Sequence, residues 1–227
     1  MCSSDLEARI GSGGYGVVYR AWDRVAEGLV AVKVFRPANG RLSPEHVARF
    51  RREGATATRV AHPGAVRVLG TGVSPAGIPY LVMELLDGPT LAERMRAVGA
   101  LPAAEGVAIL ARVAEVVAAA HDAGILHRDL KPDNVLLDVS GPKLLDFGIA
   151  RLLEDTGDGL ETVTRTGQMV GTPAYMAPER LEHGGGDLRS DVYALGAGCA
   201  RSRVRGVLPG RSFAGRWRVG RRGSMST

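Results

Sequence analysis

Residues 127–134, His-Arg-Asp-Leu-Lys-Pro-Asp-Asn, combine side chains that could carry out a group transfer. A carboxylate such as Asp129 can accept a hydroxyl proton, the ammonium of Lys131 can steady a phosphoryl group, and Asn134 can bind a metal ion. This run follows a strongly apolar segment, and so dense a set of polar and restricted residues is not typical of a structural loop. We therefore interpret it as catalytic rather than as an ordinary capped turn.

A second motif, Asp146-Phe147-Gly148, lies seventeen residues after Asp129. The carboxylate of Asp146 is a hard oxygen ligand of the kind that Mg²⁺ prefers. The motif therefore indicates a magnesium ligand.

Lysine is scarce, because Lys33, Lys131 and Lys143 are the only lysines among 29 basic Lys and Arg residues. A lysine kept in so arginine-rich a sequence suggests a specific need. Lys33 has apolar neighbours on both sides within residues 31–34, so its ammonium needs an anionic partner. Glu53 on a following predicted helix is one candidate, and phosphate oxygens are the other.

Residues 11–18, Gly-Ser-Gly-Gly-Tyr-Gly-Val-Val, form a glycine-rich segment whose backbone N–H groups can approach phosphate oxygens closely. The segment lies between two predicted strands, whereas a dinucleotide-binding fingerprint needs a strand followed by a helix. A Rossmann fold is therefore disfavoured. Taken alone, the pattern also fits a plain hairpin turn.

The elements that must position these residues fall into two groups. In the first half, runs of β-branched residues predict a mostly antiparallel sheet. An apolar face with helical spacing, which follows Ser43 as a candidate N-cap, predicts one long helix. The predicted strands are 6–10, 17–21, 30–35, 66–69 and 80–85, and the predicted helix is 44–60.

The character of the chain changes at residues 87–89, Asp-Gly-Pro. Residues 102–123 are rich in alanine with a helical apolar period, and they are apolar nearly all round, which predicts a buried helix of a second lobe. Short strands are expected at 135–137 and 143–145. Residues 149–174 are predicted to form a long loop, and loops of that length inside a compact domain are usually functional.

Two further motifs complete a characteristic order: residues 171–179, Gly-Thr-Pro-Ala-Tyr-Met-Ala-Pro-Glu, and residues 191–196, Asp-Val-Tyr-Ala-Leu-Gly. Over about residues 6–196 the chain resembles the protein kinase family. Lys131, two residues after Asp129, resembles the Ser/Thr branch. The threonine-rich run 162–166 is similar to the activation loop of bacterial eukaryotic-like kinases.

The resemblance implies an α+β, bilobal fold. An antiparallel-sheet N-lobe with one main helix would span residues 6–86. A mostly helical C-lobe would span residues 87–196 and would be incomplete, because relatives continue with further apolar helices where this sequence does not.

The resemblance also implies roles by position. Asp129 would accept the proton of a Ser or Thr hydroxyl, with Lys131 beside it, and Asn134 and Asp146 would hold Mg²⁺. Lys33 would bind the ATP phosphates and pair with Glu53. Arg128 would contact a phosphate on Thr164 or Thr166, and Thr172 would shape the substrate site. The residues expected around ATP are Ile10, Gly11, Ser12, Gly13, Gly14, Tyr15, Gly16, Val18, Ala31, Lys33, Met83, Glu84, Leu86 and Leu136.

The expected function is transfer of the ATP γ-phosphoryl group to Ser or Thr hydroxyls of proteins, including this chain itself. The expected partners are a protein substrate and, through the N-lobe, a second copy. Glu179 is expected to lack its usual arginine partner. The alternative is an inactive kinase fragment that at most binds nucleotide or a partner kinase.

The formal net charge of +5 belongs to the last segment. Residues 197–227 hold eight Arg and no acid, which leaves −3 for residues 1–196. We expect this segment to be disordered, and a frame change or truncation near residue 197 would explain it. Binding of nucleic acid through it is the weakest hypothesis, because only Phe213 and Trp217 interrupt the charges, and no specific nucleic acid is expected.

The cysteine content and the absence of long apolar runs indicate where in the cell the protein is expected. Cys2 and Cys199 cannot form a disulfide framework, which favours a reducing compartment and a cytoplasmic location. No run of eighteen apolar residues predicts a membrane segment, and the first residues have no signal-peptide pattern.

Overall fold

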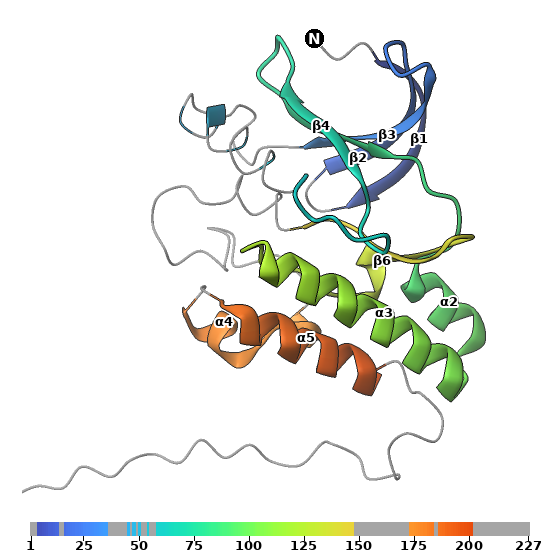
Figure 1. The fold of residues 1–227 in the computed structure, drawn as a ribbon, viewed down its shortest axis with the longest axis vertical. Coiled ribbons are helices and arrows are strands. Elements are labelled where there is room, and N and C mark those ends of the chain that lie inside the picture. The colour runs from blue at the N-terminus through green and yellow to red at the C-terminus, as the bar shows by residue number, and fades with distance from the viewer. Residues whose placement is uncertain are drawn as a thin grey trace, which may run out of the picture.

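The computed structural model describes residues 4–13, 16–35, 58–147, 173–183 and 186–201, together with positions 45, 47, 48, 50 and 54. A sheet lies at one end of the molecule and a group of helices at the other (Figure 1). This arrangement confirms the predicted α+β, two-lobed fold.

The sheet has five antiparallel strands in the order β1-β2-β3-β5-β4. Their bounds are β1 Ser4–Gly13, β2 Gly16–Asp23, β3 Gly28–Phe35, β4 Val68–Val73 and β5 Pro79–Glu84. All five strands were predicted; β4 alone is displaced along the chain, because its glycines at 70 and 72 weaken the sequence signal. The strand β3 is central and buries most of its side chains, Lys33 included.

Phe50 fills the inner face of the sheet. It is fully buried, and its ring meets that of Phe35 edge-on at 5.5 Å between centroids and an angle of 72°. Phe50 lies within the predicted helix 44–60, of which the structure describes isolated positions, five of them helical. Of the predicted apolar face, Phe50 is buried and Val47 is half-buried, whereas residues 58–60, the end of the predicted helix, are not helical.

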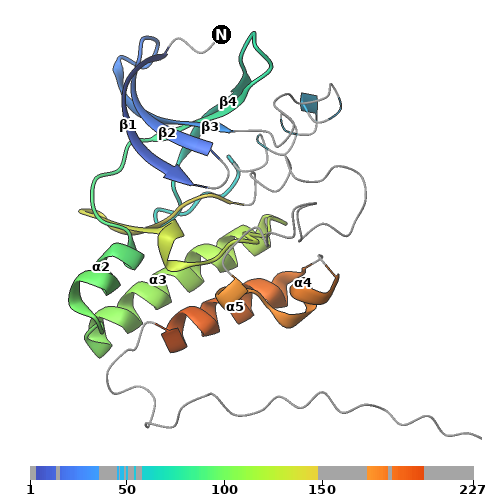
Figure 2. The ribbon, with the colours of Figure 1, turned by 180° about the vertical axis from the view of Figure 1, so that it is seen from behind.

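Four helices make up the other lobe within the described residues. They are α2 Leu91–Val98, α3 Ala103–Asp122, α4 Pro178–His183 and α5 Leu188–Arg201. The long helix α3 runs beside α5 in both views (Figures 1 and 2). Sequence reasoning missed α2, although Thr90 and Glu93 form a capping box at its start.

The prediction that α3 is buried all round was wrong. One face is buried, with Ile109, Val113, Val116, Val117 and Ala120 inside, while Val107 on the other side is 51% exposed. Small alanines on the outer face make the helix look uniformly apolar, but they cost little when they are exposed.

A short hairpin of β6 Val135–Asp138 and β7 Gly141–Leu144 lies between the two groups. Its second strand bonds to the chain that leads into β4: Leu144 N–H donates to Gly64 O at 2.7 Å, and Val66 N–H donates to Leu144 O at 2.9 Å. The hairpin thereby connects the helical lobe to the sheet. Within the described residues no helix is long and apolar enough to cross a membrane.

Candidate active site

The polar loop, residues 127–134, is held in place by one buried carboxylate. Asp191 on α5 is 2% exposed and accepts the backbone N–H groups of His127 and Arg128, each at 2.8 Å. The Nε2 atom of His121 on α3 lies 3.0 Å from the same carboxylate. Hydrogen bonds to a buried charged acceptor are strong, so two helices fix the start of the loop.

His127 anchors the loop from the other side. It is fully buried, and burial lowers its pKa, so the ring is neutral. Its Nδ1 accepts Asp129 N–H at 3.3 Å, which makes Nε2 the protonated nitrogen that donates to Leu145 O at 2.8 Å. The ring also lies against Phe147, with 5.2 Å between centroids. The loop and the Asp-Phe-Gly motif are therefore joined through this histidine.

Asp129, Lys131 and Asn134 converge, as the sequence predicts. Lys131 Nζ donates to Asp129 Oδ2 at 2.7 Å, and Asn134 Nδ2 donates to the same oxygen at 3.0 Å and to Asp129 O at 2.7 Å. Because both donors use Oδ2, Oδ1 of Asp129 is the oxygen left to accept a further proton. Because Asn134 donates through its nitrogen, its Oδ1 is left for a cation.

Lys33 reaches across from β3 to the helical lobe. Its Nζ lies 2.6 Å from Asp146 Oδ2, and its side chain is 9% exposed. This carboxylate is the anionic partner that a buried ammonium needs. Glu53, the partner proposed from the sequence, lies outside the described residues.

Asn134 and Asp146 are also brought together. Leu145 N–H donates to Asn134 O at 2.8 Å, so the residue before Asp146 is bonded directly to Asn134. An amide oxygen and a carboxylate oxygen are ligands that fit Mg²⁺, which needs few protein ligands when substrate phosphates and water supply the rest. No group of three or more His, Cys, Asp or Glu side chains forms a complete metal cage among the described residues.

Two residues of this region have left-handed backbone conformations that only glycine adopts without strain. Arg128 has φ 66° and Asp146 has φ 58°. The positions are held by their neighbours: Asp191 accepts Arg128 N–H, and the Arg180 guanidinium donates to Arg128 O. Such strain is concentrated at functional sites.

The residues predicted around adenine gather under the sheet. Ala31 and Met83 belong to one buried apolar cluster, and Val18 and Leu86 pack against its edge. Leu136, on β6, is half-buried, and Ile10 on β1 is 51% exposed. The Glu84 amide donates to Arg67 O at 3.0 Å, so its carbonyl is the group left for an adenine edge.

Gly16 has a structural requirement of its own. A Cβ atom there would lie 2.2 Å from Val34 O, because β2 and β3 approach closely at the pair Gly16–Phe35. Gly11, by contrast, leaves ordinary space around a Cβ atom, with Val18 Cβ at 3.8 Å. Gly13 ends β1, whereas Gly14 and Tyr15 are not among the described residues.

Glu179, expected to lack its usual arginine partner, has a serine partner instead: Ser190 Oγ donates to its Oε1 at 2.8 Å. No local pattern of residues signals this contact or the role of Asp191. Gly148, Thr164, Thr166 and Thr172 lie outside the described residues.

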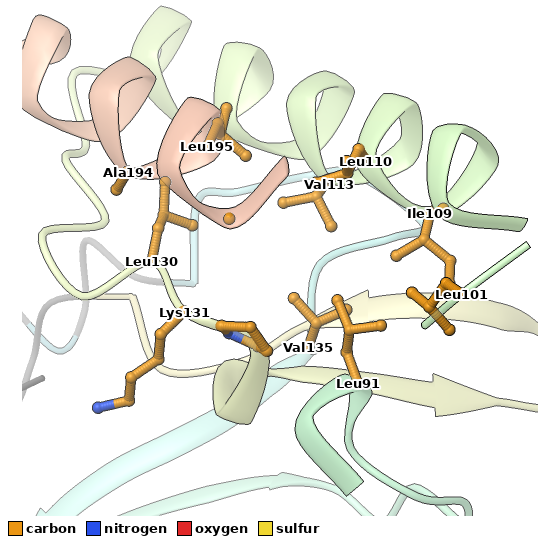
Figure 3. A pocket seen from close by; sticks show the side chains of 13 residues that line it. Leu91, Leu101, Ile109, Leu110, Val113, Leu130, Lys131, Val135, Ala194 and Leu195 are labelled. Carbon is orange, nitrogen blue, oxygen red and sulfur yellow. The ribbon is translucent and has the colours of Figure 1, made fainter. Parts of the chain in front are cut away.

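An apolar pocket of about 30 Å³ lies behind the polar loop. Figure 3 shows Leu130 and Val135 facing side chains of α3 and α5, while the Lys131 amine points away from them. The pocket therefore belongs to the packing that supports the loop and not to the cluster of charged groups.

Three comparisons relate this chain to known proteins. A model described as the protein kinase domain matches residues 4–206. The chain is 40% identical over 196 residues to the probable serine/threonine-protein kinase PknB of Corynebacterium glutamicum. It is 44% identical over 202 residues to the DNA damage-responsive serine/threonine-protein kinase RqkA of Deinococcus radiodurans.

Each alignment covers 85% of this chain but only 30% of the first relative and 28% of the second. The chain thus spans less than a third of the length of these relatives. Among solved structures, the kinase domain of Mycobacterium tuberculosis PknI superposes with a TM-score of 0.70 at 30% identity. That match covers 88% of this chain and 71% of the other.

Proposed function

Because this chain belongs to the protein kinase family, we propose that it transfers the γ-phosphoryl group of ATP to serine and threonine hydroxyls of proteins. The observation that carries this proposal is the arrangement at Asp129. Lys131 and Asn134 both bind its Oδ2, so its Oδ1 is positioned to accept the proton of a substrate hydroxyl. Accurate placement of this kind supplies much of the rate in such reactions.

ATP and Mg²⁺ fit the remaining residues. Asn134 Oδ1 and Asp146 would hold the magnesium ion, which neutralises phosphate charge when it is bound. Lys33 would exchange part of its contact with Asp146 for the ATP phosphates, since its buried ammonium requires an anion in either state. Val18, Ala31, Met83 and Leu136 would enclose the adenine ring.

The proposal includes the phosphorylation sites, the cellular location and the dimer expected from the sequence. Thr164 or Thr166 would accept a phosphate that Arg128 then binds. ATP as co-substrate, and a sequence whose two cysteines are too few for a disulfide framework, favour the cytoplasm. A homodimer through the sheet lobe is tested by the mass of the protein in solution; a monomer at every concentration contradicts it.

The test is the intact mass of the purified monomer after incubation with Mg-ATP, beside an Asp129→Asn variant. We expect added phosphate groups in the parent and none in the variant. Peptide mapping should then place phosphate on Thr164 or Thr166. A folded parent that binds ATP but gains no mass would favour the alternative function, a nucleotide-binding protein without phosphoryl transfer.

A further inference from the structure

Lys143 is the one lysine that the catalytic motifs leave without a role. Its Nζ lies 3.0 Å from Glu84 Oε1, and the two side chains are only 12% and 21% exposed. Glu84 ends β5 in the sheet lobe, whereas Lys143 lies on β7 in the hairpin. The ion pair therefore crosses between the two lobes.

Glu84 is held by more than this lysine. Its Oε1 also accepts Arg67 N–H at 2.9 Å, and its own N–H donates to Arg67 O at 3.0 Å. One carboxylate oxygen thus joins the hairpin to the chain before β4. These contacts fix the backbone of Glu84, whose carbonyl is the group proposed to face adenine.

The hairpin register places Lys143 beside the proposed floor of the adenine site. Lys143 is the direct cross-strand partner of Leu136. Directly opposed residues of antiparallel strands project their side chains to the same face. Lys143 therefore connects Glu84, at the edge of the proposed adenine site, with Leu136, at its floor. An adenine ring must fit between these two residues.

The connection 85–90 is tied to the same hairpin at its other end. Asp87 N–H donates to Asp138 Oδ1 at 3.2 Å, and Leu137 N–H donates to Pro89 O at 2.9 Å. At Gly88 the backbone comes so close that a Cβ atom would lie 2.2 Å from Leu137 O. Only the Lys143–Glu84 pair provides a charged side-chain contact at the start of this connection among the described residues.

A cavity of about 220 Å³ lies beside the ion pair, with His62, Arg67, Val68, Glu84 and Lys143 in its wall. The end of β5 is therefore not closely packed on this side. Beside this space, the position of Glu84 depends on its polar contacts.

We propose that Lys143 is a positioning residue for the adenine part of the nucleotide. It acts through Glu84, by holding the backbone of that residue at a fixed distance from Leu136. This inference rests on the proposed kinase function, because it assumes that adenine binds there. A partly exposed ion pair adds little to global stability, so its effect is expected in nucleotide affinity.

The experiment compares Lys143→Met, Lys143→Arg and the charge exchange Lys143→Glu with Glu84→Lys. For each we would measure KM for ATP, kcat, and the Kd of ADP. We expect Lys143→Met to raise KM and Kd about tenfold, a loss of about 1.4 kcal/mol in binding, with kcat changed less than about twofold. Lys143→Arg should recover most of the affinity, whereas the charge exchange should recover only part of it, because a lysine at position 84 cannot accept Arg67 N–H as Glu84 Oε1 does.

Arg94→Met is the matched control. Arg94 forms a comparable ion pair with Glu105 at 2.9 Å between α2 and the start of α3, away from the proposed adenine site. We expect this variant to lose similar thermal stability but to keep the wild-type KM. A KM for ATP that rises equally in both variants would overturn the inference, because it would indicate a general loss of stability.

The outcomes separate the two proposals. A parent that binds ADP but never transfers phosphate disproves the kinase function, and the Kd of ADP in the variants then decides the role of Lys143. Unchanged KM and Kd in Lys143→Met, or an effect on kcat alone, overturns the positioning role. If that variant fails to fold, Lys143→Leu is measured in its place, and an unchanged Kd of ADP in that variant counts against the positioning role. A folded parent that binds no nucleotide overturns both.

Discussion

Lys33 on β3 and Asp146 beyond β7 form an ion pair of 2.6 Å across 113 residues of sequence. The pair spans the two lobes and joins a buried ammonium to the carboxylate predicted to bind magnesium. The two groups are thus held in contact at the same point before any nucleotide binds. Such preorganisation reduces the reorganisation needed during phosphoryl transfer.

Replacement of Lys33 by Met is expected to lower kcat/KM for ATP on the order of a hundredfold or more. The variant loses the phosphate contact and leaves Asp146 without its cation. Phosphate incorporation and ADP binding measure the effect. Arg24→Met, which breaks the exposed pair with Asp5, serves as the control and should retain full activity. Wild-type activity in the Lys33 variant would show that the pair is not part of the site.

Gly16→Ala is expected to destabilise the protein by about 1–3 kcal/mol, because the new Cβ atom would overlap Val34 O. Urea denaturation measures the change. Gly28→Ala at the other end of the same strand pair is the control, since its nearest atom would be Ala26 O at 3.7 Å. Equal stability of the two variants would mean that Gly16 is needed for phosphate binding alone.

Asp191→Asn is expected to cost about 2–4 kcal/mol, because an amide group would replace an oxygen that accepts a buried N–H. Denaturation reports the loss, and activity should fall with it as the polar loop loses its anchor. In the control, Asp187→Asn, the exposed side chain can still accept Arg189 N–H. The role assigned to Asp191 is wrong if both variants are equally stable.

His127 should make stability depend on pH. Burial lowers its pKa below the ordinary value of 6.5, so the folded protein keeps it neutral while the unfolded chain binds a proton as the pH falls through that value. This stabilisation is fully present above about pH 6.5 and is lost below it, by at most about 1.4 kcal/mol per pH unit. Nitrogen NMR should show the ring still neutral and protonated at Nε2 below pH 6.5, where an ordinary histidine ring is mostly protonated. An ordinary titration of this ring would contradict the assignment.

The sequence predicted the strands and α3 well, because runs such as Val30–Phe35 and the apolar period of α3 are local signals. The prediction that Asp129, Lys131 and Asn134 converge was also correct, since all three lie within one short loop. The exposed side of α3 was not foreseen, because alanine is compatible with both burial and exposure. The contacts of Asp191, Lys33 and Glu84 could not be derived from spacing, because their partners lie tens of residues away. Several charged residues are possible partners for each, and the fold decides which one lies within reach.

The dependence of the polar loop on Asp191 has a consequence for biosynthesis. The acceptor of His127 N–H is made 64 residues after the histidine itself. During translation the sheet can form first, but the loop lacks its carboxylate anchor until α5 has left the ribosome. A nascent chain that stops before this helix would carry the catalytic residues without the carboxylate that holds them, so competence for phosphoryl transfer is acquired late in synthesis and in a single step.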